Sequence, residues 1–213
     1  MKHWKIYLPT SLALLAVLLL VSACATSTPS PTAQPQVSPT PASISVTDGL
    51  DRQVVLEAPA QKIVSLAPSN TEILFAIGAG AQVVGKDFYS DFPAEAADVT
   101  SISDMTATYN LEAIVGLEPD LVLAAEINAP EQVAELEKLG LNVYWLANPT
   151  DFAGVYENLM IIGQLTGHIT EAEQLVESLK ARVSAVEEKM SAVEERPLVL
   201  YELDATDLKA PYT

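Results

Sequence analysis

Short apolar runs alternate with helical patterns through most of this 213-residue chain, and this alternation limits its fold more than any other feature. Strands that alternate with helices of this length form βαβ crossovers and a mainly parallel sheet. We therefore expect an α/β lobe whose sheet is flanked by helices. The expected strands are 62–66, 82–84, 120–124 and 141–146, and the expected helices are 69–77, 111–117, 130–139 and 151–165.

Turn and cap signals mark the ends of these elements. Thr47-Asp48-Gly49 separates the apolar residues 44–46 from 53–56, and Asp-Gly is typical of the tight turn of a β-hairpin. A serine or threonine followed three residues later by glutamate forms a capping box at a helix start. This pattern occurs at Ser69 with Glu72 and at Thr170 with Glu173, and the other candidate N-caps are Asn110 and Thr150 or Asp151.

A long amphipathic pattern follows at 170–195, and Arg196-Pro197 ends it because proline cannot continue a helix. At 1.5 Å per residue this helix would be roughly 37 Å long. Residues 198–203 then resemble a strand, and the few residues after it are too short for a domain. Either the sequence is a fragment, or the last strand joins the first sheet. The apolar stripe of the helix consists of Leu175, Leu179, Val183, Val186, Met190 and Val193.

The N-terminus has the features of an export signal. Residues 1–23 combine two early lysines with an apolar run that closes on small residues, which is typical of a signal peptide. Cys24 stands at the cleavage junction, as in the bacterial lipobox, where this thiol is lipidated. Residues 25–43 hold five prolines and eight serines or threonines without any charge. We therefore expect a lipidated Cys24 and an extended tether over 24–43.

The composition excludes some kinds of partner. Removing residues 1–23 leaves nine basic and 28 acidic residues, a net charge of −19, and such a surface repels nucleic acid. Cys24 is the single cysteine, so no disulfide framework is available and the fold relies on an apolar core. The acidic surface keeps an exported protein soluble, or it helps the protein to dock on a basic partner.

The motifs of common enzyme classes are absent from the sequence. It contains no G-x-S-x-G, no P-loop, no H-E-x-x-H and no C-x-x-C, and His168 is the single histidine after residue 23. We therefore expect neither catalysis nor a metal site. Ligands of open α/β sheets bind at the carboxyl ends of strands. Ser69 and Asn70 follow one expected strand and Tyr89 follows another; alternatively, Ser69 only caps its helix and the aromatic residues only cover the sheet.

Three motifs in this region carry a family resemblance. They are IVSLAPSNTEILFAIGAG at 63–80, NLEAI at 110–114 and LEPDLVLA at 117–124. In this order, the chain resembles the cobalamin and ferric-siderophore class of ABC-importer substrate-binding proteins over about residues 46–212. The resemblance implies two α/β lobes joined by one long helix, with the ligand between the lobes. The implied parts are an N-terminal lobe at 44–168, the interlobe helix at 169–196 and the start of an incomplete C-terminal lobe at 197–213.

The resemblance also implies roles for single residues. Tyr89 matches an aromatic residue that contacts the corrin in cobalamin binders, and Glu112 matches a glutamate that docks into a basic pocket of the permease. Thr106 and Ala125 fall where those binders have further aromatic residues, so a ferric siderophore or haem is an alternative to cobalamin. The expected ligand-binding residues are Ser69, Asn70, Tyr89 and Thr106.

The sequence and the resemblance together predict an extracytoplasmic, lipid-anchored carrier. It would be a monomer without a cofactor that delivers cobalamin or a ferric chelate to an ABC permease, which a cytoplasmic ATPase drives. One alternative is a membrane-anchored hydrolase that uses Ser69, and it requires a nearby general base. Another alternative is an anchored scaffold protein that binds no small ligand.

Overall fold

The computed structural model describes residues 43–195 and 197–199. The expected signal peptide, Cys24, nearly all of the tether and most of the strand expected at 198–203 lie outside these residues. Within the described ranges, no helix has the length and apolar character needed to cross a bilayer.

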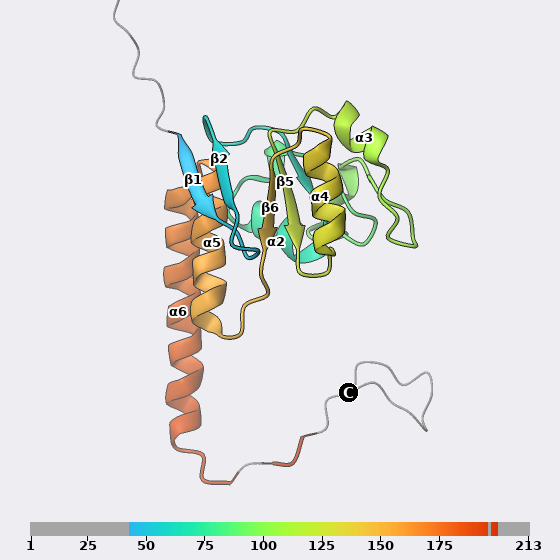
Figure 1. The fold of residues 1–213 in the computed structure, drawn as a ribbon. Coiled ribbons are helices and arrows are strands. Elements are labelled where there is room, and N and C mark those ends of the chain that lie inside the picture. Colours follow the sequence, from blue (N-terminus) through green and yellow to red (C-terminus); the bar gives the residue numbers. More distant parts are fainter. Residues whose placement is uncertain (1–42, 196, 200–213) are drawn as a thin grey trace, which may run out of the picture. The chain divides into compact units, whose positions relative to one another are not determined.

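Four parallel strands form a sheet in the order β4-β3-β5-β6, which confirms the predicted α/β lobe (Figure 1). Helices connect successive strands, as expected for parallel neighbours. The strands are β3 (Ile63–Ser65), β4 (Val83–Lys86), β5 (Leu121–Ala125) and β6 (Val143–Leu146). The helices are α2 (Pro68–Ala76), α3 (Leu111–Gly116), α4 (Pro130–Lys138) and α5 (Phe152–Thr166), with short 3-10 turns η1 (Gly80–Gln82) and η2 (Ala94–Asp98).

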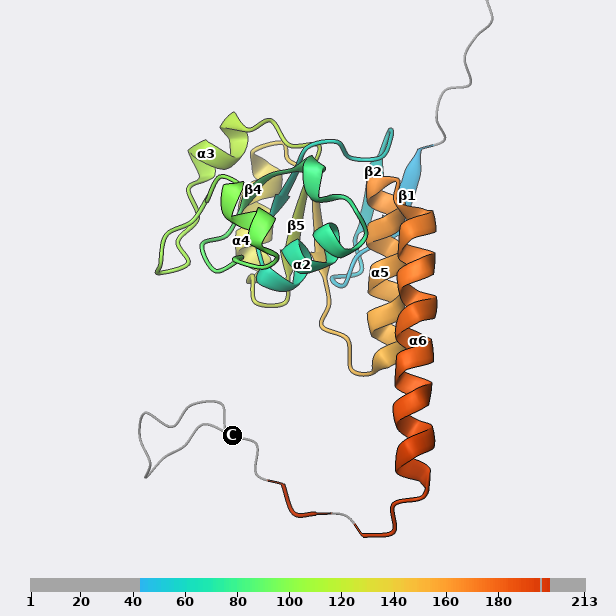
Figure 2. The same ribbon diagram turned by 180° about the vertical axis from the view of Figure 1, so that it is seen from behind.

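Both faces of the sheet are covered, because successive side chains of a strand point to opposite faces. On β5, Leu121 and Leu123 join the apolar cluster formed with α2 and α5, whereas Val122 and Ala124 join the cluster formed with α3 and α4. All four side chains are fully buried. Figure 2 shows α2 in front of the sheet, whereas α4 lies in front of it in the opposite view. This double burial explains why β5 is continuously apolar.

The predicted β-hairpin is present at the start of the described region. Strands β1 (Ile44–Thr47) and β2 (Gln53–Leu56) pair antiparallel. Their connection spans residues 48–52 and is longer than the tight turn predicted from Asp-Gly. The buried Asp48 carboxylate accepts hydrogen bonds from Leu50 N at 2.9 Å, from Arg52 N at 3.0 Å and from the Arg52 guanidinium. Trp145 N, on β6, donates to the same carboxylate at 3.3 Å.

Two of the four predicted helix caps are wrong. Helix α2 begins two residues earlier than the capping box requires, with Ala67 as N-cap instead of Ser69 and Pro68 in its first turn. Proline suits this position because its fixed φ is helical and it needs no hydrogen-bond acceptor. His168 likewise precedes the long helix, so Thr170 lies inside it. The predicted caps Asn110 and Asp151 are confirmed, because their side chains accept bonds from Ala113 N and Gly154 N.

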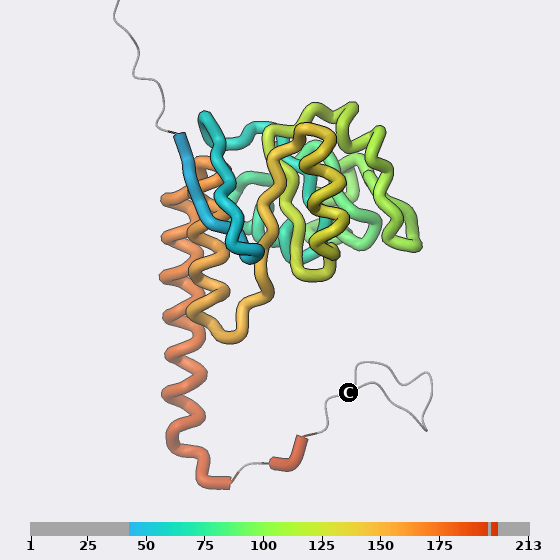
Figure 3. Tube along the Cα trace, in the orientation of Figure 1, coloured from blue at the N-terminus to red at the C-terminus, as the bar shows by residue number. Residues whose placement is uncertain are grey.

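The long helix α6 (Ile169–Ser191) follows α5 after Gly167-His168 (Figure 3). It ends four residues before the predicted limit of Glu195. Its first half packs against α5, where Ala172 and Val176 are buried. The apolar stripe then continues without cover in the described residues, with Val186 59%, Met190 54% and Val193 40% exposed.

Candidate functional site

Loops gather at the carboxyl edge of the sheet, where parallel strands present the ends of several connections together. Residues 66–67 follow β3, residues 87–93 follow β4, and residues 126–129 follow β5. The loop 101–110 before α3 joins them, because Ile102 N and Asn110 N bond to Lys86 O and Ile102 O, both at 2.8 Å.

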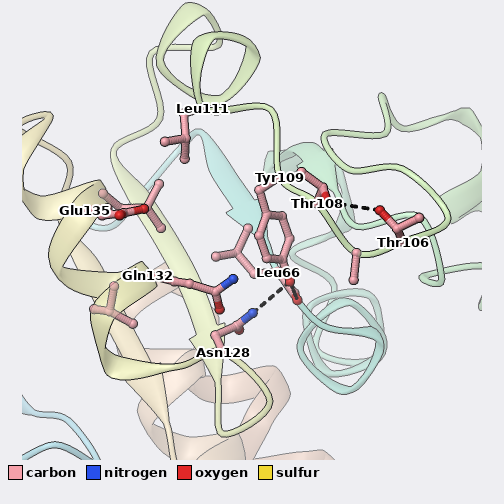
Figure 4. A pocket seen from close by; sticks show the side chains of 11 residues that line it. Leu66, Thr106, Thr108, Tyr109, Leu111, Asn128, Gln132 and Glu135 are labelled. Atoms are coloured by element: carbon pink, nitrogen blue, oxygen red, sulfur yellow. Dashed lines mark hydrogen bonds between the residues drawn. The ribbon is translucent and has the colours of Figure 1, made fainter.

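Two adjoining hollows open among these loops. We call the first the Thr106 hollow; it has a volume of about 390 Å³ and is shown in Figure 4. We call the second the Tyr89 hollow; it measures about 230 Å³. The Tyr89 hollow is lined by Leu66, which follows β3, and by Asp87 and Tyr89, which follow β4. The sequence predicted a shared surface for Ser69 and Tyr89, but Ser69 is not among the lining residues. Residues that line both hollows are Leu66, Ala107, Tyr109, Asn128 and Gln132.

Tyr109 and Asn128 form the polar ridge common to the two hollows. The Tyr109 hydroxyl donates to Leu66 O at 2.8 Å and accepts from Asn128 Nδ2 at 2.7 Å (Figure 4). Asn128 Oδ1 accepts from Ala125 N at 2.8 Å, which fixes the ridge to the end of β5. Burial raises the pKa of the Tyr109 hydroxyl, and the negative charge of Asp87 raises it further against the opposing bond from Asn128. The phenol is therefore uncharged near neutral pH.

Asp104 orders the loop that forms the wall of both hollows. Its Oδ1 accepts from Thr106 Oγ1 at 2.6 Å, from Thr106 N at 2.8 Å and from Thr108 N at 3.1 Å. These bonds, led by the one from the Thr106 hydroxyl, hold the pKa of Asp104 below its ordinary value. Across the opening, the Tyr89 hydroxyl donates to Met105 O at 2.6 Å. The loop and Tyr89 thus hold each other in place.

A cluster of buried polar side chains stabilises the loop after β4. Thr71 Oγ1 lies 2.8 Å from both Ser65 Oγ and Ser90 Oγ, and Ser90 Oγ donates to Asp87 Oδ2. Asp87 Oδ1 accepts from Tyr89 N at 2.8 Å. This chain of hydrogen bonds connects β3, α2 and the loop that carries Tyr89. Buried polar groups paired in this way hold one conformation.

The structure separates the sequence-predicted site residues into two groups. Tyr89 and Thr106 line the hollows. Ser69 is exposed on the first turn of α2 and lines neither hollow. Asn70 is fully buried, and its Nδ2 donates to Leu123 O and Ala124 O, both at 3.1 Å, so it fastens α2 to β5. Glu112 is exposed in the first turn of α3, outside both hollows.

Sequence reasoning missed Asp87, Tyr109 and Asn128. Asp87 directly follows β4, and Asn128 lies three residues beyond β5. Polar residues just past a parallel strand were the signal that selected Ser69 and Asn70, so the same rule could have selected these two. Tyr109 carries no such signal, because it precedes a helix and reaches the site across the loop.

No metal site is found in the described part of the chain. No group of three or more His, Cys, Asp or Glu residues there could hold a metal ion. His168 precedes α6, with Nδ1 at 3.1 Å from Thr166 O. Among the described residues, no side-chain hydrogen bond joins Ser69 to a general base.

Comparisons with known proteins agree with this architecture. A family model described as periplasmic binding protein matches residues 63–212. The ABC transporter substrate-binding lipoprotein YvrC of Bacillus subtilis is 34% identical over 149 residues, covering 68% of this chain and 47% of that protein. A vitamin B12-binding protein of Vibrio campbellii is 30% identical over 146 residues, covering 68% of this chain and 52% of that protein. The chain thus spans about half the length of these curated relatives.

Solved structures show the same likeness. The periplasmic vitamin B12 binding protein BtuF of Vibrio cholerae superposes with a TM-score of 0.57 at 27% identity, covering 63% of this chain and 52% of that one. A periplasmic heme binding protein of Pseudomonas aeruginosa superposes with a TM-score of 0.57 at 25% identity, covering 62% of this chain and 48% of that one. These matching proteins are binding proteins by description.

Proposed function

Because this chain belongs to the periplasmic binding protein family, we propose that it is the substrate-binding component of an ABC importer. It captures cobalamin or a ferric chelate, either a siderophore or haem, and delivers the ligand to a permease that a cytoplasmic ATPase drives. The observation that carries the proposal is the pair of hollows joined along Tyr109 and Asn128 at the carboxyl edge of the sheet. The names of the relatives, which include vitamin B12-binding and heme binding proteins, support this ligand range.

Tyr89 and Thr106 contact the ligand. Tyr89 and Ile127, which line the Tyr89 hollow, are 55% and 78% exposed. Met105, whose carbonyl oxygen accepts from the Tyr89 hydroxyl, is 68% exposed. Such exposed apolar side chains suit a broad apolar ligand face, because ligand sites are mostly apolar with a few orienting polar groups. Ser69 follows the lining residue Pro68 in the chain but lines neither hollow itself. Asn70 acts from beneath it by holding α2 against β5, rather than by touching the ligand.

The second half of the binding cleft belongs to a C-terminal lobe that begins in 197–213, after the interlobe helix at 169–196. The uncovered part of α6 supports this organisation. Phe152, Leu179, Val183 and Val186 line a hollow of about 360 Å³ along the helix, and a second lobe would cover it. Exposed apolar surface of this kind usually marks an interface.

The protein is extracytoplasmic and held near the membrane by a lipid on Cys24, with 24–43 as its tether. The lipoprotein description of the Bacillus subtilis relative supports the anchor. Glu112 docks on the permease; its exposed position in the first turn of α3, outside both hollows, leaves it free for that role. The protein works as a monomer and as a carrier rather than as an enzyme.

The test is a binding titration. The protein from residue 25 to the end of its natural reading frame is titrated calorimetrically with cyanocobalamin, haemin and a ferric hydroxamate. We expect saturable binding of at least one of them, weakened about tenfold or more by Tyr89→Ala, because this change removes a ring that covers the ligand. The control is Leu139→Ala, which truncates an apolar residue of similar exposure outside both hollows. A protein that binds none of the three would contradict the proposal and favour the scaffold alternative.

A further inference from the structure

The surface of the two hollows is built from a segment without basic residues. Residues 87–137 contain no lysine, arginine or histidine, but they contain 12 aspartates and glutamates. Every residue that lines the hollows, except Leu66 and Pro68, comes from this segment. Asp87 and Glu135 are themselves lining residues, and Asp104 lies in the wall loop.

None of the described basic side chains lines the Thr106 hollow or the Tyr89 hollow, and two of them are paired with carboxylates. Arg52 is paired with Asp48 and Glu137, and Lys62 is paired with Glu118. Lys86, at the end of β4, and Lys138, at the end of α4, flank the segment along the chain, and neither lines these two hollows. Lys86 is only 7% exposed and points its ammonium group at Asp87 O at 3.4 Å. Within residues 43–195, the remaining basic residues also follow the segment, at His168, Lys180, Arg182 and Lys189.

The hydroxyl donors of the hollows are also engaged. The Tyr109 hydroxyl donates to Leu66 O, the Tyr89 hydroxyl to Met105 O, and the Thr106 hydroxyl to Asp104 Oδ1. The Thr108 hydroxyl is paired with that of Thr106 at 2.9 Å. What these groups still offer a ligand is acceptor capacity on their oxygen atoms. Among the described lining residues, a carboxylate or catecholate of the ligand would find no cation and no free hydroxyl donor, only the side-chain amide N–H groups of Gln132 and Asn128. Ligand N–H groups would find several acceptors.

We propose that this lobe selects ligands that carry no net negative charge and that present N–H donors around an apolar face. This inference rests on the proposed function and narrows its ligand class. Amide-bearing corrinoids and neutral or cationic ferric hydroxamates fit it. Tricatecholate complexes and tetrapyrroles with free carboxylates do not. Selectivity arises from repulsion of the wrong ligand as much as from attraction of the right one.

A matched pair of probes tests this claim. Cyanocobalamin and its monocarboxylate, in which one side-chain amide is hydrolysed, differ in a single charge. Ferrioxamine B, which is cationic, and ferric enterobactin, which carries three negative charges, provide a second contrast. Dissociation constants are measured with the protein from residue 25 to the end of its reading frame, at 20 mM and 500 mM salt. Within each pair, we expect the anionic member to bind about tenfold or more weakly at low salt, with a smaller difference at high salt because salt screens charges.

Two variants test whether the weaker binding of anionic probes comes from carboxylates that line the hollows. Glu135→Gln removes a carboxylate that lines the Thr106 hollow, and Glu131→Gln removes one that lies one turn earlier on the same helix but outside both hollows. Both side chains are exposed, so neither change threatens folding. We expect Glu135→Gln to narrow the ratio between cyanocobalamin and its monocarboxylate twofold or more, and Glu131→Gln to narrow it less.

The outcomes are distinct. Anionic probes that bind as tightly as their partners, or more tightly, would overturn the charge inference while leaving the carrier function intact. Equal effects of Glu135→Gln and Glu131→Gln would overturn it as well, because the selectivity would not come from the hollow. If none of the four probes binds but haemin does, this inference is overturned while the carrier function stands. If haemin fails to bind as well, the proposed function and this inference are contradicted together.

Discussion

Asn128 Nδ2 donates to the Tyr109 hydroxyl at 2.7 Å and so connects the turn after β5 to the loop before α3. The Tyr109 hydroxyl in turn donates a hydrogen bond to Leu66 O, just after β3. Three segments far apart in sequence therefore meet at one phenol, between two hollows. Rigid support of this kind lowers the entropy cost of ordering a binding surface when ligand arrives.

The first prediction concerns this phenol. Tyr109→Phe keeps the ring but leaves Asn128 Nδ2 without its acceptor, and an unpaired buried polar group costs about 1–3 kcal/mol. We expect urea denaturation to show a loss of stability in this range. Tyr89→Phe is the control, because its hydroxyl bond to Met105 O is exposed and is worth about 0.5 kcal/mol or less. Equal effects of the two changes would show that the Tyr109 bonds do not support the loops.

Asp48 gives the lobe a predictable dependence on pH. Burial disfavours its charge, but hydrogen bonds from Arg52, Leu50 and Trp145 outweigh burial and lower its pKa below 3.8. A carboxyl group with a lowered folded pKa stabilises the protein above its unfolded pKa, and this contribution is lost as the pH falls through the folded value. We therefore expect Asp48→Asn to cost more stability at pH 7 than at pH 3.

The matched control is Asp51→Asn in the same loop. Asp51 has a positive φ of 59°, which asparagine tolerates well. Urea denaturation of both variants at each pH measures the difference. A cost of Asp48→Asn that does not change with pH would contradict the role of its ionised form.

Replacing glycine with alanine should change the stability of the protein in opposite directions at two positions, Gly163 and Gly116. A Cβ at Gly163 would lie 2.7 Å from Ala172 Cβ and 3.0 Å from His168 O, so alanine would push α5 away from α6 at a cost of about 1–3 kcal/mol. A Cβ at Gly116, on α3, would meet nothing within 4 Å. There alanine lowers the entropy of the unfolded chain, and we expect a gain of up to about 1 kcal/mol. Thermal unfolding distinguishes the two, and a stabilising Gly163→Ala would show that the helices can separate freely.

Local patterns predicted the elements well, because each strand and helix leaves its own periodicity in the sequence. The continuous apolar run of β5 and the caps Asn110 and Asp151 were sufficient to place their elements. The capping boxes at Ser69 and Thr170 were wrong because neighbouring residues, Pro68 and the Gly167-His168 turn, determine where those helices begin.

The site was predictable only in part. The strand-end rule found the loop of Tyr89, but it also selected Asn70, whose side chain helix rotation directs into the protein. Tyr109 and Asn128 were missed because their contact joins different loops, and no local pattern encodes a pairing across 19 residues. Strand order and loop packing, rather than periodicity, bring such residues together.

The last prediction concerns delivery of the ligand. If Glu112 docks on the permease, Glu112→Arg should leave ligand affinity unchanged, because the residue lies outside both hollows. Transport into vesicles that contain the cognate permease and ATPase should fall about tenfold or more, since the change places like charges together at the interface. Glu131→Arg, on the first turn of α4, is the control for an equal change of net charge. If both variants transport equally well, Glu112 has no docking role; if Glu112→Arg weakens ligand binding instead, its effect belongs to the binding site.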